Sequence, residues 1–328
     1  MKKNVFLIGA GNIGSRHLQA LKAVCLPLNI KVVDPNEANL ATAKERWEAM
    51  PEKSKITRQQ QVEFLNTLPA NKNKIDLAII STSANVRAKI IRELLKKNKV
   101  KYLLMEKILF QKKSDYDSIG RLLAKNKIKA WVNCSRRAMP WYQKLAAELR
   151  GRSFTALVSL GSFSLISNVI HYLDYFSLIA DDNRFIINTS QIEKKLISSK
   201  RPEFKELIGT IEVYFKNNSS VKITSRANDR GPLLVYINTP AIYCLLNETT
   251  GQHLIARASH NWKLEKINSP LILQSQLTNK IVEKILKNNS SNLTPLRESS
   301  TIHLNFLEPI LKHLNRFQVI KYKKYPFT

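Results

Sequence analysis

The decapeptide SNVIHYLDYF, residues 167–176, contains two side chains that can exchange protons. His171 and Asp174 stand three residues apart in an otherwise apolar stretch. On a helix this spacing places them on one face together with Asn168, so we expect the polar row to face a cleft or solvent. A histidine beside a carboxylate can act as a general base or acid, but the same pair also occurs as a histidine held at a helix surface. The rest of the sequence has to decide between the two.

A glycine-rich turn near the N-terminus, GAGNIG, predicts a binding site for a diphosphate. Gly9, Gly11 and Gly14 follow the apolar run VFLI and precede a helix-forming run. In that context the first glycine permits a tight turn, the second lets the backbone approach a pyrophosphate, and the third allows the helix to pack closely on the strand. The diphosphate would then lie at the helix N-terminus, against the backbone of Asn12 and Ile13.

Asp34 ends the next predicted strand, 20 positions after Gly14. A carboxylate at that place accepts hydrogen bonds from the adenosine ribose and repels a 2′-phosphate, which favours NAD over NADP. Lys44 and Arg46 lie farther along the following helix, so NADP remains possible. A glycine turn without a cofactor is the alternative, and the strand–turn–helix context disfavours it.

The elements that would position these residues form a regular alternation over the first 130 residues. Apolar runs, which we interpret as strands, alternate with amphipathic stretches, which we interpret as helices. This alternation predicts an α/β domain at residues 1–130, a Rossmann fold with a parallel sheet and helices on both faces. The polar segment 51–73 cannot be assigned. The predicted strands are NVFLIGAG, IKVVDP, DLAIIST, KYLLMEK and KAWVNCS.

Later in the chain the pattern changes to longer alternating runs separated by turn residues. Ile211 and Val213 alternate with polar residues, KNNSS supplies a turn, and Val221 and Ile223 resume the alternation. We therefore predict a second domain, residues 131–328, of the α+β class. It is built on an open, mostly antiparallel sheet and includes a returning C-terminal helix. One sheet face should pack on helices, which leaves the other for a substrate cleft or a subunit interface.

The composition indicates a folded chain with a strong positive field. With 328 residues, 44% hydrophobic and 24% charged, the chain is long enough for two domains. Its formal net charge of +28 would steer a polyanion, whether nucleic acid, a phospholipid surface or a phosphorylated metabolite. The lysines are scattered along predicted helices, and no nucleic-acid-binding signature accompanies them. We read them mainly as solvated helix faces and expect no nucleic-acid partner.

The cysteines and the lengths of the apolar runs predict where in the cell the protein lies. Cys25, Cys134 and Cys244 are far apart and form neither a metal spacing nor an even disulfide set, so we expect no metal site and a reducing cytoplasm. No run approaches ~20 apolar residues, so no membrane span is expected. The short apolar run at the N-terminus breaks into glycines, which does not suit a signal peptide.

Several motifs in order resemble the Gfo/Idh/MocA family of sugar oxidoreductases. The run GAGNIGSRHLQAL resembles the family's opening. DLAIISTSANVRAKII resembles its fourth-strand segment, with Thr82 present but Ser83 and Arg87 where proline and histidine are usual. VNCSRRAMPWYQKL is similar to the stretch that leads into the second domain, with Arg137 and Pro140 in matching places. LTPLRESSTIHLNFLEPIL is similar to the closing helix, so the resemblance spans nearly the whole chain.

The stretch LLMEKILF is similar to the family's Glu-Lys-Pro motif. Glu106 and Lys107 are present, and Ile108 replaces the proline. A bond before proline adopts the cis form at small cost, whereas an ordinary residue needs ~3 kcal/mol. If relatives use that geometry to aim the lysine, Ile108 must aim it otherwise.

The opening decapeptide falls in the family's third motif, a glycine followed by a histidine and, three residues later, an aspartate. These are Gly161, His171 and Asp174. Relatives often carry an aspartate four residues before the histidine, where this chain has Ser167. The orientation of His171 would then depend on Asn168 or Asp174.

The resemblance implies a hydride transfer between a nicotinamide ring and a sugar carbinol or ketone, bound between the two sheets. An alcohol can lose hydride only if a base takes its proton, and a cation must stabilise the developing alkoxide. His171 can be the base and Lys107 the cation, or the roles may be exchanged, with Asp174 beside the histidine. Glu106 would orient the lysine or the nicotinamide amide, and Thr82 belongs to the cofactor site.

The substrate class implied by NVIHYLD is a nucleotide-linked sugar, as in relatives of surface-polysaccharide pathways. The positive charge agrees, because a dianionic diphosphate would be drawn to it. Arg137 and Asn168 are candidate substrate ligands, and a homodimer or homotetramer is expected. Three further arginines are candidate diphosphate or carboxylate ligands: Arg136, Arg226 and Arg230.

A second interpretation is a cofactor-binding sensor or scaffold of the same fold that has lost turnover. The departures at Ile108 and Ser167 suggest it. A third, in which the charge serves nucleic acid or an anionic membrane, is the weakest, since the basic residues lack a stacking platform.

Overall fold

Two compact units make up the chain. The computed structural model describes residues 1–51, 59–70, 74–161, 165–199 and 201–328. Unit 1 consists of Met1–Ala138 and Ile272–Arg297, and unit 2 of Met139–Leu271 and Glu298–Thr328. The division differs from the predicted domains at two places. Unit 1 continues past residue 130, and it includes 272–297, because the helix of that segment packs along the first helix of the chain.

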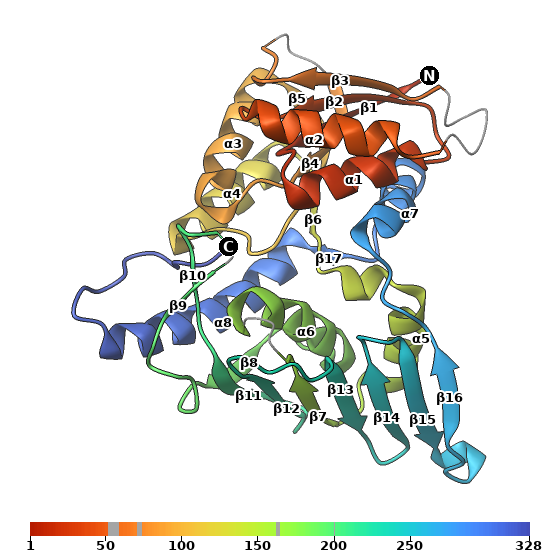
Figure 1. Cartoon of the computed structure of the whole chain (residues 1–328), viewed down its shortest axis with the longest axis vertical. Coiled ribbons are helices and arrows are strands. Elements are labelled where there is room, and N and C mark those ends of the chain that lie inside the picture. Colours follow the sequence, from red (N-terminus) through yellow and green to blue (C-terminus); the bar gives the residue numbers. More distant parts are fainter. Residues whose placement is uncertain (52–58, 71–73, 162–164, 200) are drawn as a thin grey trace. The chain divides into compact units, whose positions relative to one another are not determined.

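The sheet of unit 1 confirms the predicted Rossmann fold (Figure 1). Its order is β17-β6-β5-β4-β1-β2-β3, and all neighbours are parallel except β17, which runs antiparallel to β6. All five predicted strands are present. The strand β3 was not predicted, because its short, partly exposed sequence QVEFL lies in a segment that is otherwise mostly polar. The bounds are β1 Lys3–Ile8, β2 Leu28–Val33, β3 Gln61–Leu65, β4 Lys74–Ile80, β5 Lys99–Met105, β6 Lys129–Val132 and β17 Thr294–Pro295.

The helices of unit 1 follow from amphipathic sequences and from local capping. The Asn36 side chain accepts hydrogen bonds from the backbone N–H groups of Ala38 and Asn39, which fixes the start of α2. Helix α1 contacts both α2 and α7, and α3 contacts α4. The unassigned segment contains β3, while residues 52–58 and 71–73 lie outside the described ones. The bounds are α1 Asn12–Lys22, α2 Glu37–Glu48, α3 Ala84–Lys97, α4 Lys113–Lys125, η2 Ser135–Ala138 and α7 Gln274–Asn288.

Unit 2 is built on an eight-stranded, mostly antiparallel sheet, as predicted. The predicted hairpin is β11–β12, with Ile211 opposite Ile223 and Val213 opposite Val221. The order is β16-β15-β14-β13-β7-β12-β11-β8, and β7 runs parallel to β12. The bounds are β7 Thr155–Ser159, β8 Phe185–Asn188, β11 Gly209–Phe215, β12 Ser220–Ser225, β13 Leu234–Asn238, β14 Ile242–Asn247, β15 Gln252–Arg257 and β16 Glu265–Asn268, beside a small sheet of β9 Ile197–Ser198 and β10 Lys205–Glu206.

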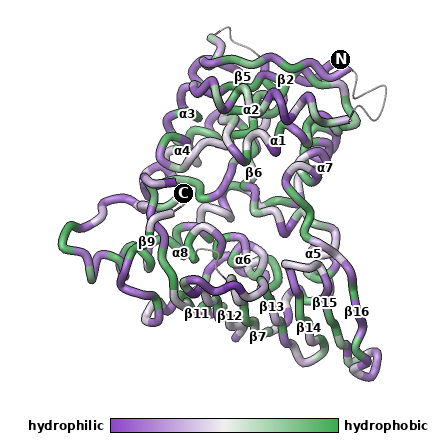
Figure 2. Tube along the Cα trace, viewed as in Figure 1, coloured by the Kyte–Doolittle hydropathy of each residue, from purple (hydrophilic) through white to green (hydrophobic). Residues whose placement is uncertain are grey.

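One face of this sheet is covered and the other is open. Figure 1 shows α6 and α8 on the same side of the sheet, and Figure 2 shows hydrophobic residues along the strands. Val158 and Val213 are buried beneath the helices, whereas Leu157 and Tyr214 on the opposite face are exposed. The alternation predicted from the sequence therefore has the expected buried and outward rows. The helices are α5 Pro140–Leu149, α6 Leu165–Ala180, η3 Ala258–His260 and α8 Leu296–Phe317.

The described helices differ from membrane-spanning ones. None of these helices combines the length and the apolar character needed to cross a bilayer.

The packing of α1 on β1 leads to a stability prediction. A Cβ added at Gly14 would lie 1.9 Å from the carbonyl oxygen of Gly9, whereas one at Gly120 in α4 would meet nothing within 4 Å. We expect Gly14→Ala to lower the free energy of unfolding by about 1–3 kcal/mol, since overpacking shifts backbone. Gly120→Ala, the control, should leave it unchanged or raise it by up to about 1 kcal/mol. Urea denaturation of both variants measures this, and equal stabilities would contradict the close packing.

Candidate functional site

The carboxyl edge of the parallel sheet is held level by backbone hydrogen bonds that continue one residue past the strands. Each residue directly after a strand donates its N–H to the carbonyl oxygen at the end of the neighbouring strand. These bonds run from Asp34 to Leu65 (3.1 Å), Gly9 to Val33 (2.8 Å), Ser81 to Ile8 (2.9 Å), Glu106 to Ile80 (3.0 Å) and Asn133 to Met105 (2.8 Å). Because β1 lies between β2 and β4, the strand order reverses here, which is where open α/β sheets bind ligands.

The glycine turn has the geometry that a diphosphate requires. Gly9 has φ +97°, a conformation that favours glycine. Gly14, in the first turn of α1, packs so closely on Gly9 that an added Cβ would lie 1.9 Å from the Gly9 carbonyl oxygen. A Cβ at Gly11 would meet nothing within 4 Å, so the backbone there borders open space. The N–H groups of Asn12 and Ile13 lie in the first turn of α1, where no intrahelical acceptor exists.

Thr82 adds a polar group at the same edge. It follows β4, and its Oγ1 atom is buried with no hydrogen-bond partner among the described residues. An orphaned buried hydroxyl next to an open glycine turn suits a polar ligand that supplies the missing partner. The chain's own residues therefore fit a bound dinucleotide at Gly9, Gly11, Gly14 and Thr82.

The Asp34 carboxylate is buried and held by the chain itself. It accepts the N–H of Ala10 at 2.7 Å and the N–H of Asn36 at 2.9 Å, and the Asn39 side-chain amide lies 3.3 Å from both of its oxygens. These bonds tie the end of β2 to the glycine turn and fix the carboxylate where a ribose would bind. Arg46 in α2 donates to the Ser15 hydroxyl in α1.

Glu106 forms the centre of a buried hydrogen-bond network. Its Oε1 atom accepts from Asn133 at 2.5 Å and lies 2.9 Å from Nε2 of His17, a fully buried residue of α1. Nδ1 of His17 lies 2.8 Å from Oγ1 of Thr278 in α7, and the Asn133 amide also reaches Gln274 at 2.8 Å. Sequence reasoning missed these partners. The only signal was the histidine of the motif SRH, because the other contacts join distant segments.

The ionisation of Glu106 reflects a balance of burial and neighbours. Burial opposes the charged form, but the hydrogen bond and charge of His17 and the hydrogen bond of Asn133 outweigh it, so the pKa of this carboxyl falls below its ordinary value. The charge of the adjacent Lys107 contributes in the same direction. Glu106 is therefore a buried carboxylate next to the half-buried Lys107.

The peptide bond between Lys107 and Ile108 is cis. The backbone after the bond is held by Arg87 of α3, whose guanidinium donates to the carbonyl oxygens of Ile108 and Leu109.

In unit 2, helix α6 carries the polar row of the decapeptide. Asn168 and His171 are half-buried, but Asp174 is only 1% exposed, so the expectation that the whole row faces a cleft or solvent is wrong at Asp174. The reason is that α6 is covered over most of its length, and its second half is buried almost all round. At the start of α6, the buried carboxylate of Glu206 accepts the N–H groups of Ile166 (3.0 Å) and Ser167 (3.1 Å).

The predicted arginines and Gly161 occupy different environments. Gly161 has φ +57°, and a Cβ there would lie 2.6 Å from the Gly231 carbonyl oxygen, which requires glycine. Arg136 and Arg137, the candidate ligands of the sequence motif VNCSRRAMP, are buried in η2. Arg226 remains exposed, 3.8 Å from the carboxylate of Asp229.

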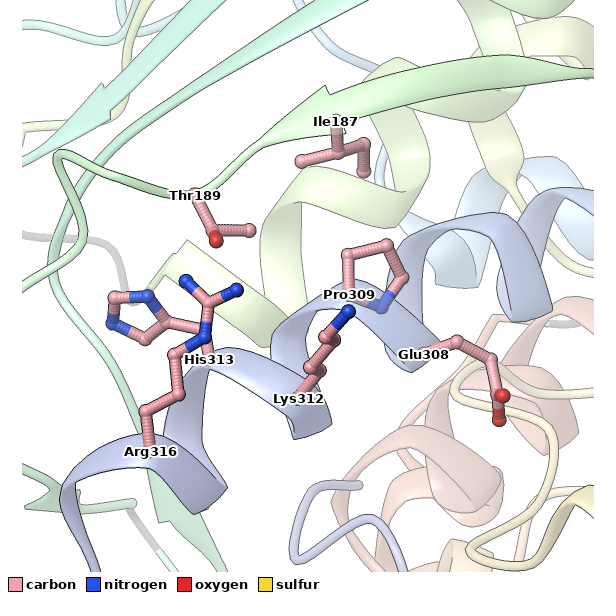
Figure 3. Close-up of a pocket in the computed structure, with 7 residues that line it drawn as sticks. All are labelled: Ile187, Thr189, Glu308, Pro309, Lys312, His313 and Arg316. Carbon is pink, nitrogen blue, oxygen red and sulfur yellow. The ribbon is translucent and has the colours of Figure 1, made fainter.

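A pocket of about 470 Å³ lies in unit 2 between the end of β8 and helix α8 (Figure 3). Thr189 faces the side chains of Lys312 and Arg316 across it. No predicted site residue lines this pocket, so it is not part of the candidate site. Its remaining lining residues are Ile187, Glu308, Pro309 and His313.

The potential metal ligands and the cysteines lie apart from one another. Among the described residues, no group of three or more His, Cys, Asp or Glu side chains is arranged to hold a metal ion. The three cysteines are free thiols, and burial raises the pKa of Cys244 to about 12.

Comparison with known protein families finds a match in the N-terminal part of the chain. Residues 3–134 match the model of the Gfo/Idh/MocA oxidoreductase family, NAD-binding Rossmann fold. This confirms the resemblance found in the sequence for these residues, which are similar to the NAD-binding part of that oxidoreductase family. No curated protein sequence matches the chain significantly.

Solved structures share the fold over nearly the whole chain. An oxidoreductase from Agrobacterium radiobacter, in complex with NAD+, L-tartaric acid and magnesium, has a TM-score of 0.73 at 14% identity, covering 93% of this chain and 94% of its own. A UDP-N-acetylglucosamine 3-dehydrogenase from Acidithiobacillus ferrooxidans has a TM-score of 0.70 at 13% sequence identity, and the match covers 97% of this chain and 100% of that chain. A 3-ketoreductase from Actinomadura kijaniata, in complex with NADP, has a TM-score of 0.64 at 14% sequence identity, and the match covers 92% of this chain and 95% of that chain.

The lowered pKa of Glu106 leads to a pH prediction. A carboxyl whose folded pKa is depressed stabilises the fold above its unfolded pKa and loses that contribution as pH falls through the folded value. We expect the difference in unfolding free energy between the native protein and Glu106→Gln to be constant near neutral pH and to shrink below about pH 4.5. Denaturation at several pH values measures it. The exposed Glu63→Gln variant is the control, and a difference that grows on acidification would contradict the assignment.

Proposed function

We propose that the protein is an NAD-dependent sugar oxidoreductase that transfers a hydride between the nicotinamide and a sugar hydroxyl or ketone. One observation carries the proposal. The open glycine turn, the Asp34 carboxylate, the orphaned Thr82 hydroxyl and the Glu106–Lys107 pair all lie at one edge of the parallel sheet. A dinucleotide site and a cationic side chain are the two requirements for stabilising an alkoxide beside a hydride acceptor.

The cofactor would be held by this chain's own groups. The glycine backbone and the first turn of α1 bind the diphosphate, and Asp34 binds the adenosine ribose. Asp34 supports NAD over NADP, because its buried carboxylate would repel a 2′-phosphate. Arg46 does not offset this, since it is already engaged with Ser15. When bound, the dinucleotide supplies the hydride acceptor or donor.

Proton transfer is assigned to the two residues predicted from the sequence. Lys107 directly follows the buried carboxylate of Glu106, whose pKa its charge helps to lower. It stabilises the developing alkoxide, and His171 takes the proton from the sugar hydroxyl, or the two exchange these roles. We propose that Asp174 acts beside His171. The Glu206 carboxylate holds the start of the helix that carries His171, and Asn168 and Arg137 are proposed substrate ligands.

The proposed substrate is a nucleotide-linked sugar of surface-polysaccharide biosynthesis. Two of the similar structures are those of a UDP-N-acetylglucosamine 3-dehydrogenase and a 3-ketoreductase. The structure of the 3-ketoreductase has also been solved in complex with NADP and TDP-benzene. The net charge of +28 favours a diphosphate-linked substrate. The free thiols are in keeping with a reducing cytoplasm.

Cofactor binding is the first test. We expect NADH to bind more tightly than NADPH at physiological and raised salt, and Gly11→Asp to abolish binding. The added Cβ meets no neighbour, so this variant should fold, while its carboxylate fills the space of the diphosphate. Fluorescence titration measures the affinity. Binding that merely follows ionic strength, or that survives in the variant, would contradict the site.

Turnover is then measured with a panel of nucleotide sugars by NADH absorbance. Lys107→Ala should lower kcat by about 10²- to 10⁴-fold, the usual contribution of a proton-transferring or charge-stabilising group. Lys99→Ala, at the exposed start of the same strand, is the control. Cofactor binding without turnover on any sugar would instead support a sensor or scaffold role.

We further propose a homodimer formed through the open face of the eight-stranded sheet. Leu157, Tyr236 and Leu245 stand directly opposite one another on three adjacent strands and form an outward apolar row. Beside it, Lys222 and Glu212 form an ion pair at 3.4 Å. This face is therefore nearly neutral on a protein of strong positive charge, so it is the surface on which a second copy meets least repulsion.

Light scattering after gel filtration tests the dimer. Leu245→Lys should convert a dimer to a monomer, because the lysine would be buried against its own copy. Val319→Lys, at a residue 98% exposed in the C-terminal segment, should leave the dimer intact. A native protein that runs as a monomer would contradict the proposal.

A further inference from the structure

Arg87 is a buried cation at the edge of the candidate site. It lies on α3 and is only 1% exposed, which is unusual for arginine. Its guanidinium donates to three backbone carbonyl oxygens: those of Thr82, Ile108 and Leu109, the last at 2.8 Å. These carbonyls belong to the segments that follow β4 and β5. A single side chain thus joins the two strand ends that carry Thr82 and Lys107.

The segment after Lys107 depends on such contacts for its shape. Between the end of β5 and the start of α4 the backbone has no regular ladder, so its buried carbonyl oxygens must find donors elsewhere. Arg87 supplies two of these donors. The buried hydroxyl of Tyr116 supplies the next, donating to the Phe110 carbonyl at 3.2 Å. Burial raises the pKa of Tyr116 well above its ordinary range, so this hydroxyl stays protonated and remains a donor.

The segment before Lys107 is fixed independently. Glu106 is held by His17 and Asn133, and its backbone N–H is bonded to the end of β4. The backbone of Lys107 is therefore held on both sides, by the Glu106 network before it and by Arg87 after it. The Cα atom of Lys107 therefore has a fixed position, from which its side chain extends.

Two departures from the family pattern meet in this contact. The resemblance places a histidine at position 87 and a proline at position 108, and this chain has Arg87 and Ile108 instead. The guanidinium of Arg87 donates to the carbonyl oxygen of Ile108. Arginine has five N–H donors and histidine at most two, so a histidine could not serve all three carbonyl oxygens.

We infer that Arg87 is a positioning residue that sets the place of Lys107 and of the Thr82 strand end, in compensation for the absent proline at position 108. The inference rests on the proposed function, in which Lys107 takes part in hydride transfer. It predicts a coupling between residues 87 and 108. Arg87→His alone should impair the site, because three carbonyl oxygens lose their donor, and Arg87→His together with Ile108→Pro should be tolerated better.

The test is a double-mutant cycle of Arg87→His and Ile108→Pro, with kcat, KM and the NADH dissociation constant measured for each variant. Arg87→His should lower kcat by about ten- to a hundredfold, because displacement of a catalytic group by about 1 Å has that effect. Its NADH dissociation constant should change by less than about threefold, since the glycine turn and Asp34 are untouched. The double variant should regain at least about tenfold of the lost kcat.

Arg92→His is the matched control on the same helix. Arg92 is exposed and binds Asp115 of α4 at 2.7 Å, so its loss should leave kcat unchanged. A purely structural role of Arg87 would lower the melting temperature while leaving kcat per folded molecule unchanged. That result, or a double variant no more active than Arg87→His, would overturn the inference.

Amide hydrogen exchange separates this inference from the proposed function. In Arg87→His without cofactor or substrate, exchange of the segment 107–111 should accelerate at least about tenfold, while β1 and α1 keep their protection. Absence of turnover in the native protein would defeat the proposed function, and exchange would still decide the role of Arg87 in holding the segment. Unchanged exchange at 107–111 would overturn that role.

Discussion

Five backbone hydrogen bonds, each made one residue beyond the end of a parallel strand, fix the edge on which the candidate site depends. They keep Gly9, Asp34, Ser81, Glu106 and Asn133 at one level although these residues lie far apart in sequence. The side chains that follow therefore start from a common line. The open backbone at the glycine turn and the carboxylates on either side of it have defined places before any ligand arrives, which reduces the ordering that binding would require.

The buried charged groups at this edge are surrounded by hydrogen-bond partners. A carboxylate removed from water is costly unless donors surround it, and Glu106 has His17 and Asn133 for that purpose. A guanidinium removed from water has the same need, which Arg87 meets with backbone carbonyl oxygens. Lys107 stands in the chain between Glu106 and the carbonyl oxygens that Arg87 binds, and it is itself only half-buried. The two buried charged groups are shielded from salt, unlike most of the lysines that give the protein its net charge.

Local signals in the sequence predicted what depends on neighbouring residues. The glycine turn, the five strands and the register of the 211–223 hairpin follow from short-range spacing, and the structure has them. Contacts between distant segments had no such signal: His17 and Glu106 are 89 residues apart, and His17 and Thr278 are 261 apart. The helical spacing correctly placed Asp174 on the face of His171, but not its burial, because burial depends on what packs against that face. The edge strand β3 was missed since it is only five residues long and lies in a mostly polar segment.

The nucleotide-binding unit is made from two stretches of chain, and residues 139–271 are synthesised between them. Helix α7, which belongs to the later stretch, contacts α1 and supplies the Thr278 hydroxyl beside His17. On the ribosome, His17 and Glu106 emerge long before this partner exists. The first unit therefore has one side of α1 uncovered until residues 274–288 have been translated. The nucleotide site is complete only after unit 2 residues 139–271 have been synthesised, and a chain that stops before α7 lacks this part of the site.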